Sequence, residues 1–330
     1  MTRVCRDSKG VILIALLWIL TALSVIALSF SREGFVEVAA ARNTRDLADA
    51  YYIARAGLMA AVYQIMQRQL NPGVQQLELQ NAPDPIDLGI VTGGFGDGEY
   101  LVDVQDESGK INLNFVMDEQ LRTLLDAIGI PKHDADIIAD SIMDWKDADS
   151  AHRLNGAEDD YYQSLNPPYK AKNGRLDTVE ELLLVRGVTL DYFYGHSEKT
   201  LDGSIIYKYG LSRYLTVYSM TPSTNINYAP VQVLMSIPGI SPQVAQAIYE
   251  RRKVRPFANV NEITQQLPAT IGPMSMPFLS TNRTGIFTLT ARAHRENSRV
   301  QRAVRAVVSL DAREVNQYKI IYWNENVPNL

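Results

Sequence analysis

The sequence predicts an α+β protein in which one long N-terminal helix packs on a small antiparallel sheet, and a large helical domain is inserted into that sheet. Three observations predict this fold class. An uncharged apolar run near the N-terminus continues without a break into an amphipathic helical pattern. The C-terminal part alternates between polar and apolar residues, as strands do. The middle of the chain repeats a unit of helix, glycine-centred turn and helix.

The apolar run, VILIALLWILTALSVIALSF, covers residues 11–30 and contains no charged side chain. Twenty residues at about 1.5 Å rise each make a helix of about 30 Å, which is the thickness of the hydrocarbon core of a bilayer. Three basic residues, Arg3, Arg6 and Lys9, precede the run. Because basic flanks stay on the cytoplasmic side, the pattern predicts a single-pass protein with a cytoplasmic N-terminus and its bulk on the other side.

Three interpretations of this N-terminus are open. A cleaved secretory signal has an apolar core of about 7–15 residues followed closely by an A-x-A site, and residues 39–41 have those letters but follow several charged residues. A plain uncleaved anchor is the second interpretation. In the third, the basic leader ends in Gly10 immediately before the helix, which resembles the class III leader of type IV pilins and pseudopilins. That resemblance implies cleavage after Gly10 by prepilin peptidase and N-methylation of Val11.

The helical pattern continues from residue 31 to residue 70, where apolar residues recur at intervals of three, four and seven, and Asn71-Pro72-Gly73 ends it. The two halves predict a single helix of about 60 residues and about 90 Å. The only cysteine is Cys5, inside the leader, so the mature chain would have no disulfide. The net charge of −5 does not point to nucleic acid or to an acidic membrane surface.

Two segments in the middle of the chain share one plan of alternating strand, polar turn, Ile-Asn pair, helix, glycine turn and helix. The first begins at Tyr100 and the second at Leu215. At an offset of 110 residues, four positions of the first segment match four of the second: Leu124 and Leu234, Gly129 and Gly239, Ala135 and Ala245, Ile138 and Ile248. The pattern predicts an internal repeat of helix-hairpin-helix units.

Helix-hairpin-helix units bind DNA in some proteins, through hairpin amides and nearby basic residues. Arg251, Arg252, Lys253 and Arg255 follow the second hairpin and keep this alternative open. The second helix of the first hairpin instead carries four aspartates, which would repel a phosphate backbone. Helix packing or protein contact is therefore the favoured role, and nucleic acid is not an expected partner.

Residues 132–160 carry nine carboxylates against three basic side chains. Oxygen ligands at short, irregular spacing in a loop suit calcium, which accepts about six to eight oxygens in flexible geometry. A solvated acidic loop is the alternative, and the spacing does not match the twelve-residue loop of an EF-hand. Self-repulsion among so many carboxylates favours a bound cation. We therefore predict calcium as a cofactor.

Catalysis finds little support in the sequence. The four histidines form no metal-ligand pair, and the chain has neither a P-loop nor a dinucleotide fingerprint. The glycine-rich stretch 93–98 enters a strand rather than a helix. Alternating segments 285–294 and 300–310, followed by 318–323, predict the closing antiparallel strands. The sequence predicts a protein that is not an enzyme.

The order of these parts resembles the minor pseudopilin K family of type II secretion systems (the general secretion pathway protein K family). In most pilin-like proteins the fifth mature residue is a glutamate, whereas here it is Ala15, as is typical of that family. The motifs that carry the resemblance are Gly10-Val11, DESGKINLN at 106–114, DWKDAD at 144–149, GAE at 156–158 and INYA at 226–229. The resemblance implies calcium ligands at Asp144, Asp147, Asp149, Glu158 and Asp159.

The resemblance also implies a pilin-like fold with a helix-hairpin-helix (SAM-like) insert and a structural function. The protein would cap the tip of the periplasmic pseudopilus and help initiate its assembly for protein export across the outer membrane. Its partners would be minor pseudopilins I and J, the other pseudopilins and the inner-membrane assembly platform. Ala15 would determine the tip position. In the family, the carboxylate at this position neutralises the N-terminal amine of the neighbouring, already assembled subunit, and a subunit without the carboxylate cannot make this contact. A membrane-anchored DNA receptor and a minor pilin of a type IV pilus are the alternatives.

The expected location is the inner membrane, with the N-terminus cytoplasmic and the globular part periplasmic, and the pseudopilus tip after assembly. The expected organisation divides the chain into seven parts. These are the leader at 1–10, the membrane half of the helix at 11–30, its amphipathic half at 31–71, the first part of the sheet at 72–112, the inserted helical domain with the acidic loop at 113–215, a second strand and hairpin unit at 216–284, and the closing strands at 285–330.

Overall fold

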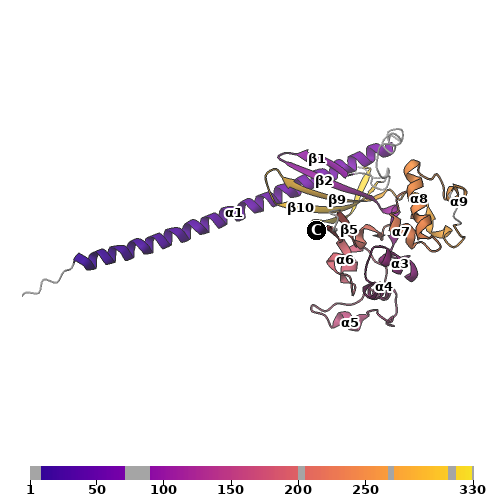
Figure 1. The fold of residues 1–330 in the computed structure, drawn as a ribbon, viewed down its shortest axis with the longest axis horizontal. Helices are drawn as coiled ribbons and strands as arrows, with labels where there is room; N and C mark the ends of the chain where they lie inside the picture. Colours follow the sequence, from indigo (N-terminus) through magenta and orange to yellow (C-terminus); the bar gives the residue numbers. More distant parts are fainter. Residues whose placement is uncertain (1–8, 71–89, 200–204, 267–270, 311–316, 329–330) are drawn as a thin grey trace, which may run out of the picture.

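The computed structural model describes residues 9–70, 90–199, 205–266, 271–310 and 317–328. The first eight residues of the predicted leader and the predicted helix stop at residues 71–73 therefore lie outside the described residues. Figure 1 shows a long stalk that enters a globular head at one end of the molecule.

One helix, α1, runs from Lys9 to Leu70 and forms the stalk (Figure 1). Its 62 residues span about 90 Å, which confirms the prediction of a single helix. Large apolar side chains are exposed around the whole circumference of its N-terminal half, and Trp18 is 72% exposed. Because contiguous apolar surface of this extent is unfavourable in water, this half of α1 requires an apolar environment.

A five-stranded antiparallel sheet packs against the C-terminal half of α1. Its strand order is β1-β2-β9-β10-β11, with the bounds Ile90–Phe95, Gly98–Asp106, Ile286–Arg295, Gln301–Leu310 and Tyr318–Asn324. Alternate residues of the strands face α1, so that Val102, Leu289 and Val304 are wholly buried with Ala54 and Leu58 of the helix. The predicted closing strands are confirmed, and the sheet keeps one face for the helix.

The insert lies between β2 and β9 and joins the sheet on the side away from the stalk (Figure 1). It consists mainly of short helices and two-residue strands. In chain order its elements are η1 Glu107–Gly109, β3 Ile111–Asn112, α3 Asp118–Ala127, α4 Lys132–Lys146, α5 Asp159–Gln163, η2 Val179–Leu184, α6 Leu190–Tyr194, β4 His196–Lys199, β5 Ile205–Lys208, η3 Leu211–Arg213, β6 Leu215–Thr216, β7 Thr224–Asn225, α7 Val231–Ser236, α8 Pro242–Val254, α9 Asn261–Gln266, η4 Met276–Phe278 and β8 Leu279–Ser280.

The insert has one hydrophobic core. One cluster of buried side chains, including Leu124, Ile138 and Leu234, draws residues from both 113–215 and 216–284. These two ranges, predicted as separate parts, therefore form one domain. The strand expected from Leu215 onward is also shorter than its alternating pattern indicates. Only Leu215 and Thr216 form β6, and they pair in parallel with Ile111 and Asn112 of β3. Two short parallel pairings thus replace a second part of the main sheet.

The internal repeat is visible in matched glycine turns and matched asparagines. Gly129 and Gly239 both have positive φ angles, of 85° and 80°, which favour glycine. The side-chain oxygens of Asn112 and Asn225 each accept a hydrogen bond from the backbone amide two residues further on, at 2.8 and 3.0 Å. Local asparagine turns therefore hold the start of each hairpin unit.

The second asparagine of each hairpin unit, Asn114 or Asn227, makes an equivalent pair of hydrogen bonds in the two units. The amide of Asn114 pairs with the backbone of Leu176 through two hydrogen bonds of 2.8 and 3.0 Å. Asn227 makes the equivalent pair with the backbone of Phe257 at 2.8 and 2.9 Å. Leu176 and Phe257 each precede a short helix, so both units fix that helix in the same way.

Candidate functional site

The acidic loop connects the end of α4 to the start of α5. Asp147 caps the C-terminal end of α4, directly after Lys146, and Glu158 directly precedes the first turn of α5. A carboxylate at the C-terminal end of a helix faces the partial negative charge of the last carbonyl groups. The two ends of the loop therefore lie close together, and each carries a carboxylate. The repulsion between these carboxylates is unfavourable without a counter-charge.

Three of the five predicted ligands lie together. One carboxylate oxygen from each of Asp147, Asp149 and Glu158 lies within 4.8 Å of the other two, and we call these residues the carboxylate cluster. Glu158 is only 2% exposed. Both of its carboxylate oxygens, and Oδ1 of Asp147, are buried without a hydrogen-bond partner among the described residues.

Burial and like charge act together on the cluster. Burial, followed by the charges of Asp144 and Asp147, raises the pKa of Glu158 above its ordinary value. Burial and the charge of Asp149 likewise raise the pKa of Asp147. Buried carboxylates without donors are costly unless a cation compensates them. The donor set of the cluster consists of hard oxygens alone, and it fits a calcium ion better than a transition metal.

Asp144 lies beside the cluster and already has partners. It is wholly buried, its carboxylate accepts the backbone amide of Arg153 at 3.2 Å, and the guanidinium of Arg153 lies 3.5 Å away. Burial is the main cause that raises its pKa. A Cβ atom added to Gly156 would meet Oδ2 of Asp144 at 1.8 Å, so the loop approaches this carboxylate as closely as a glycine allows.

Asp159 lies outside the carboxylate cluster. Its carboxylate accepts the backbone amide of Ala171 at 2.9 Å and lies 3.9 Å from the ammonium group of Lys170. These contacts join α5 to the following loop. The family resemblance placed Asp159 in the predicted ligand set, but the first turn of α5 directs its side chain to Ala171 and away from the cluster.

Most of the other acids in residues 132–160 form ion pairs or hydrogen bonds within the protein, with partners that residue spacing does not predict. Arg122 of α3 contacts Asp118 at 2.8 Å and Asp136 at 2.6 Å, and it also forms an ion pair with Asp140. The hydroxyl of Tyr192 donates to Asp134 at 2.6 Å. The argument from self-repulsion therefore applies to the carboxylate cluster and not to the whole acidic segment.

The basic residues after the second hairpin are mostly engaged with the protein itself. Arg252 is wholly buried and donates to the carbonyl groups of Ile226 and Ala229 at 2.5 and 2.6 Å. Arg255 lies 3.5 Å from Glu262, and Lys253 lies 3.4 Å from a carboxylate of α8. Because Arg252 cannot reach a phosphate, this surface does not favour the DNA-receptor interpretation.

The residues of the predicted processing site lie at the start of α1. Gly10 and Val11 are in the first turn of the described helix, and Ala15 is exposed one turn later. Among the described residues, one helix is long and apolar enough to cross a membrane, with a mean hydropathy of 2.6 in its most apolar window and no part of that window buried. Length and composition thus agree with a membrane anchor.

The fold and this anchor define a class of protein: a pilin-like, membrane-anchored chain whose sheet is interrupted by a helical insert. Residues 101–194 match the first domain of type II secretion system protein K, and residues 222–268 match a helix-hairpin-helix motif. In these comparisons the chain is similar to protein K of type II secretion systems.

Relatives cover different parts of the chain. The type II secretion system protein K of Pseudomonas aeruginosa is 26% identical over 283 residues, which are 79% of this chain and 78% of that protein. The protein K of Aeromonas hydrophila is 28% identical over 201 residues, which are 56% of this chain and 60% of that protein. A crystal structure of the GspK-GspI-GspJ complex from enterotoxigenic Escherichia coli contains a chain with a TM-score of 0.54 and 18% identity, matched over 83% of this chain and 98% of that one. At this identity the likeness concerns the fold.

Proposed function

We propose that this chain is a minor pseudopilin that caps the tip of the type II secretion pseudopilus and helps to initiate its assembly. The observation that carries the proposal is the position of the insert. It interrupts the sheet between β2 and β9 and widens the head on the side away from the stalk (Figure 1). A fibre of packed α1 helices accommodates such a head where no further subunit lies above it.

Ala15 supports the same position. In pilin-like proteins the carboxylate at the fifth mature residue neutralises the N-terminal amine of a neighbouring subunit, and residues 11–30 of this chain contain no carboxylate. An uncompensated amine in an apolar environment is costly. A subunit without the carboxylate is therefore suited to be the first subunit assembled, with the later subunits below it.

The proposed partners are the minor pseudopilins I and J, followed by the other pseudopilins and the inner-membrane assembly platform. The structure with a similar fold was determined as a GspK-GspI-GspJ complex, and residues 101–194 of this chain match the first domain of protein K. The role is structural rather than enzymatic, because the chain would act through its shape and its contacts.

The proposed topology places the N-terminus in the cytoplasm, α1 across the inner membrane and the head in the periplasm. Prepilin peptidase would cleave after Gly10, and Val11 would be N-methylated. The basic leader and the exposed apolar half of α1 support this arrangement. After assembly the head would lie at the pseudopilus tip.

A calcium ion bound by Asp147, Asp149 and Glu158 would hold the end of α4 to the start of α5. The unpartnered buried oxygens of Glu158 and Asp147 support this site. Asp144, one helical turn before Asp147, would contribute negative charge next to the ion. The ion would stabilise the loop and supply no chemistry.

The tip position can be tested by labelling an epitope on the head in cells that assemble visible fibres. We expect the label at one end of each fibre and in a ratio of about one per fibre. A matched epitope on a major pseudopilin provides the control for access along the fibre. A label spaced along the fibres would refute the tip role, while a family role in secretion would remain.

A further inference from the structure

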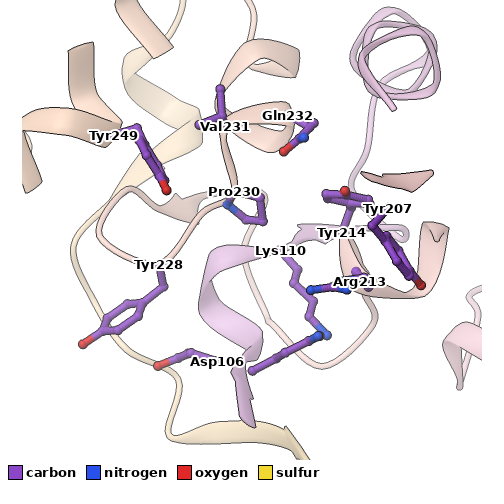
Figure 2. A pocket seen from close by; sticks show the side chains of 11 residues that line it. Asp106, Lys110, Tyr207, Arg213, Tyr214, Tyr228, Pro230, Val231, Gln232 and Tyr249 are labelled. Carbon is purple, nitrogen blue, oxygen red and sulfur yellow. The ribbon is translucent and has the colours of Figure 1, made fainter. Parts of the chain in front are cut away.

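A pocket of about 380 Å³ opens where the end of β2 meets η3 and the second hairpin unit. Figure 2 shows its wall, to which Tyr207, Tyr214, Tyr228 and Tyr249 contribute rings from different segments. Arg213 and Gln232 lie between them, and we call this cavity the tyrosine pocket. It is distinct from the carboxylate cluster and from α1, and the proposed function does not use it.

Arg213 is the cation of the pocket that makes no ion pair with the described residues, although the charge of Asp103 acts on it from a greater distance. Its guanidinium lies 4.7 Å from the centre of the Tyr207 ring, and no carboxylate of the described residues lies within ion-pair distance of it. Asp106, the acid among the lining residues, and its neighbour Glu107, which does not line the pocket, are both engaged elsewhere. Asp106 accepts from Arg283 at 3.0 Å, and Glu107 pairs with Lys110. The pocket therefore offers positive charge in a chain whose net charge is −5.

Hydroxyl donors accompany this charge. The phenol groups of Tyr214 and Tyr228 line the pocket and make no hydrogen bond to the described residues. The hydroxyl of Tyr207, in contrast, already donates to the carbonyl of Tyr194. The guanidinium of Arg213 and the free O–H donor of Tyr214 are suited to the oxygens of a carboxylate, whereas the hydroxyl of Tyr228 points away from Arg213 (Figure 2).

The remaining wall suits a peptide chain. Tyrosine rings give rigid, amphipathic contact area at low entropic cost, and tyrosine and arginine are enriched where proteins bind one another. The amide of Gln232 can both donate to and accept from a peptide backbone. The volume of about 380 Å³ accommodates one or two side chains rather than a folded surface.

We propose that the tyrosine pocket binds an acidic peptide segment of a partner protein, with a glutamate or aspartate carboxylate on Arg213 and the adjacent residues against the tyrosine rings. Charge complementarity selects an acidic partner, and the phenol hydroxyl of Tyr214 donates to the same carboxylate. The site lies at the junction of sheet and insert, so a bound segment would contact both parts of the head.

The test uses the full chain in detergent and the fluorescein-labelled pentapeptide Gly-Glu-Tyr-Glu-Gly, measured by fluorescence anisotropy. We expect saturable binding that weakens with added salt, and at least tenfold weaker binding of the glutamine version Gly-Gln-Tyr-Gln-Gly. Arg213→Gln should weaken binding of the acidic peptide about tenfold. Arg299→Gln, which removes an exposed arginine outside the pocket, should leave it unchanged.

A second variant keeps the test independent of the packing of Arg213. Gln232 is partly exposed, and Gln232→Glu changes its charge with little change of shape. This variant should melt at the wild-type temperature and bind the acidic peptide about tenfold more weakly. Equal binding of the two peptides, equal effects of Arg213→Gln and Arg299→Gln, or no saturable binding would overturn the proposal. Full competition by free acetate would also overturn it, because it would show a site for small anions.

Discussion

Glu158→Gln is expected to change the stability of the protein in opposite directions with and without calcium. The substitution keeps the size of the side chain and removes one negative charge from the carboxylate cluster. Without calcium, the wild-type glutamate lies buried within 4.8 Å of an oxygen of Asp147, and neither of its own oxygens has a partner among the described residues. With the proposed calcium ion bound, the same oxygens would be ligands.

The size of the effect follows from the geometry of one pair. Two unit charges 4.8 Å apart repel by about 3 kcal/mol at an effective dielectric constant of about 20. We count only the pair of Asp147 and Glu158. Asp149 is exposed and its charge is screened. Asp144 also acts on Glu158, but Arg153 lies 3.5 Å from its carboxylate and offsets its charge. The glutamine amide is also buried without partners and offsets part of the gain. The variant should therefore be more stable than wild type by about 2 kcal/mol in a chelator, a rise in Tm of about 4–8 °C.

The assay is thermal unfolding of the full chain in detergent, followed by circular dichroism, in a chelator and in excess calcium. Calcium at about 100 times its Kd stabilises the wild type by about 2.7 kcal/mol. The variant should lose most of this gain, so that its Tm lies above the wild-type Tm in the chelator and below it in calcium. Glu119→Gln is the matched control, because Glu119 is an exposed glutamate of the same insert. It should leave both values unchanged.

Two outcomes would refute this reasoning. If Glu158→Gln lowers the Tm in the chelator, then the buried carboxylate has a partner that stabilises it and the repulsion is not present. If calcium raises the Tm of wild type and variant equally, the ion binds elsewhere. A wild-type Tm that calcium does not move would remove the calcium site altogether.

Three further predictions concern the loop, the second hairpin unit and the N-terminus. Gly156→Ala should lower the stability by about 1–3 kcal/mol in thermal unfolding, because its Cβ would lie 1.8 Å from Asp144, whereas Gly174→Ala, whose nearest atom lies at 3.7 Å, should have little effect. Arg252→Met should cost about 3 kcal/mol, since two backbone carbonyls lose a buried donor, and a wild-type Tm would contradict that role. Mass spectrometry of the protein from membranes should show a chain that begins at N-methylated Val11; an intact Met1 or a start at Arg42 would contradict processing of the pilin type.

Local periodicity predicted the helices and strands whose hydrogen-bond partners lie within the same helix or on the next strand in the sequence. The apolar and amphipathic halves of α1 and the alternation of β9 and β10 are of this kind. The glycine turns at Gly129 and Gly239 were also readable, because few residues other than glycine adopt their positive φ angles. The paired asparagines of the repeat could have been found from their common N-x-N spacing, but the sequence does not reveal the backbone that their amides bind.

Partners distant in the sequence were not predictable in the same way. Arg122 lies outside the acidic segment, yet it neutralises part of it by approaching from α3. Arg252 looked like a surface cation beside Arg251 and Lys253, but the face of α8 that it occupies turns toward the core. Helical spacing does not distinguish such a buried arginine from an exposed one when several basic residues follow one another.

The sequence by itself determined the single long helix with its apolar half, the order of sheet and insert, and the acidic character of the loop, since each depends on composition or on neighbours a few residues apart. Only the tertiary structure decided which carboxylates meet. Asp147, Asp149 and Glu158 converge because α4 ends and α5 begins at the same place, whereas Asp159 turns to another backbone amide. The tyrosine pocket likewise exists only after folding, because its rings come from separate segments that the shared core of the insert brings together.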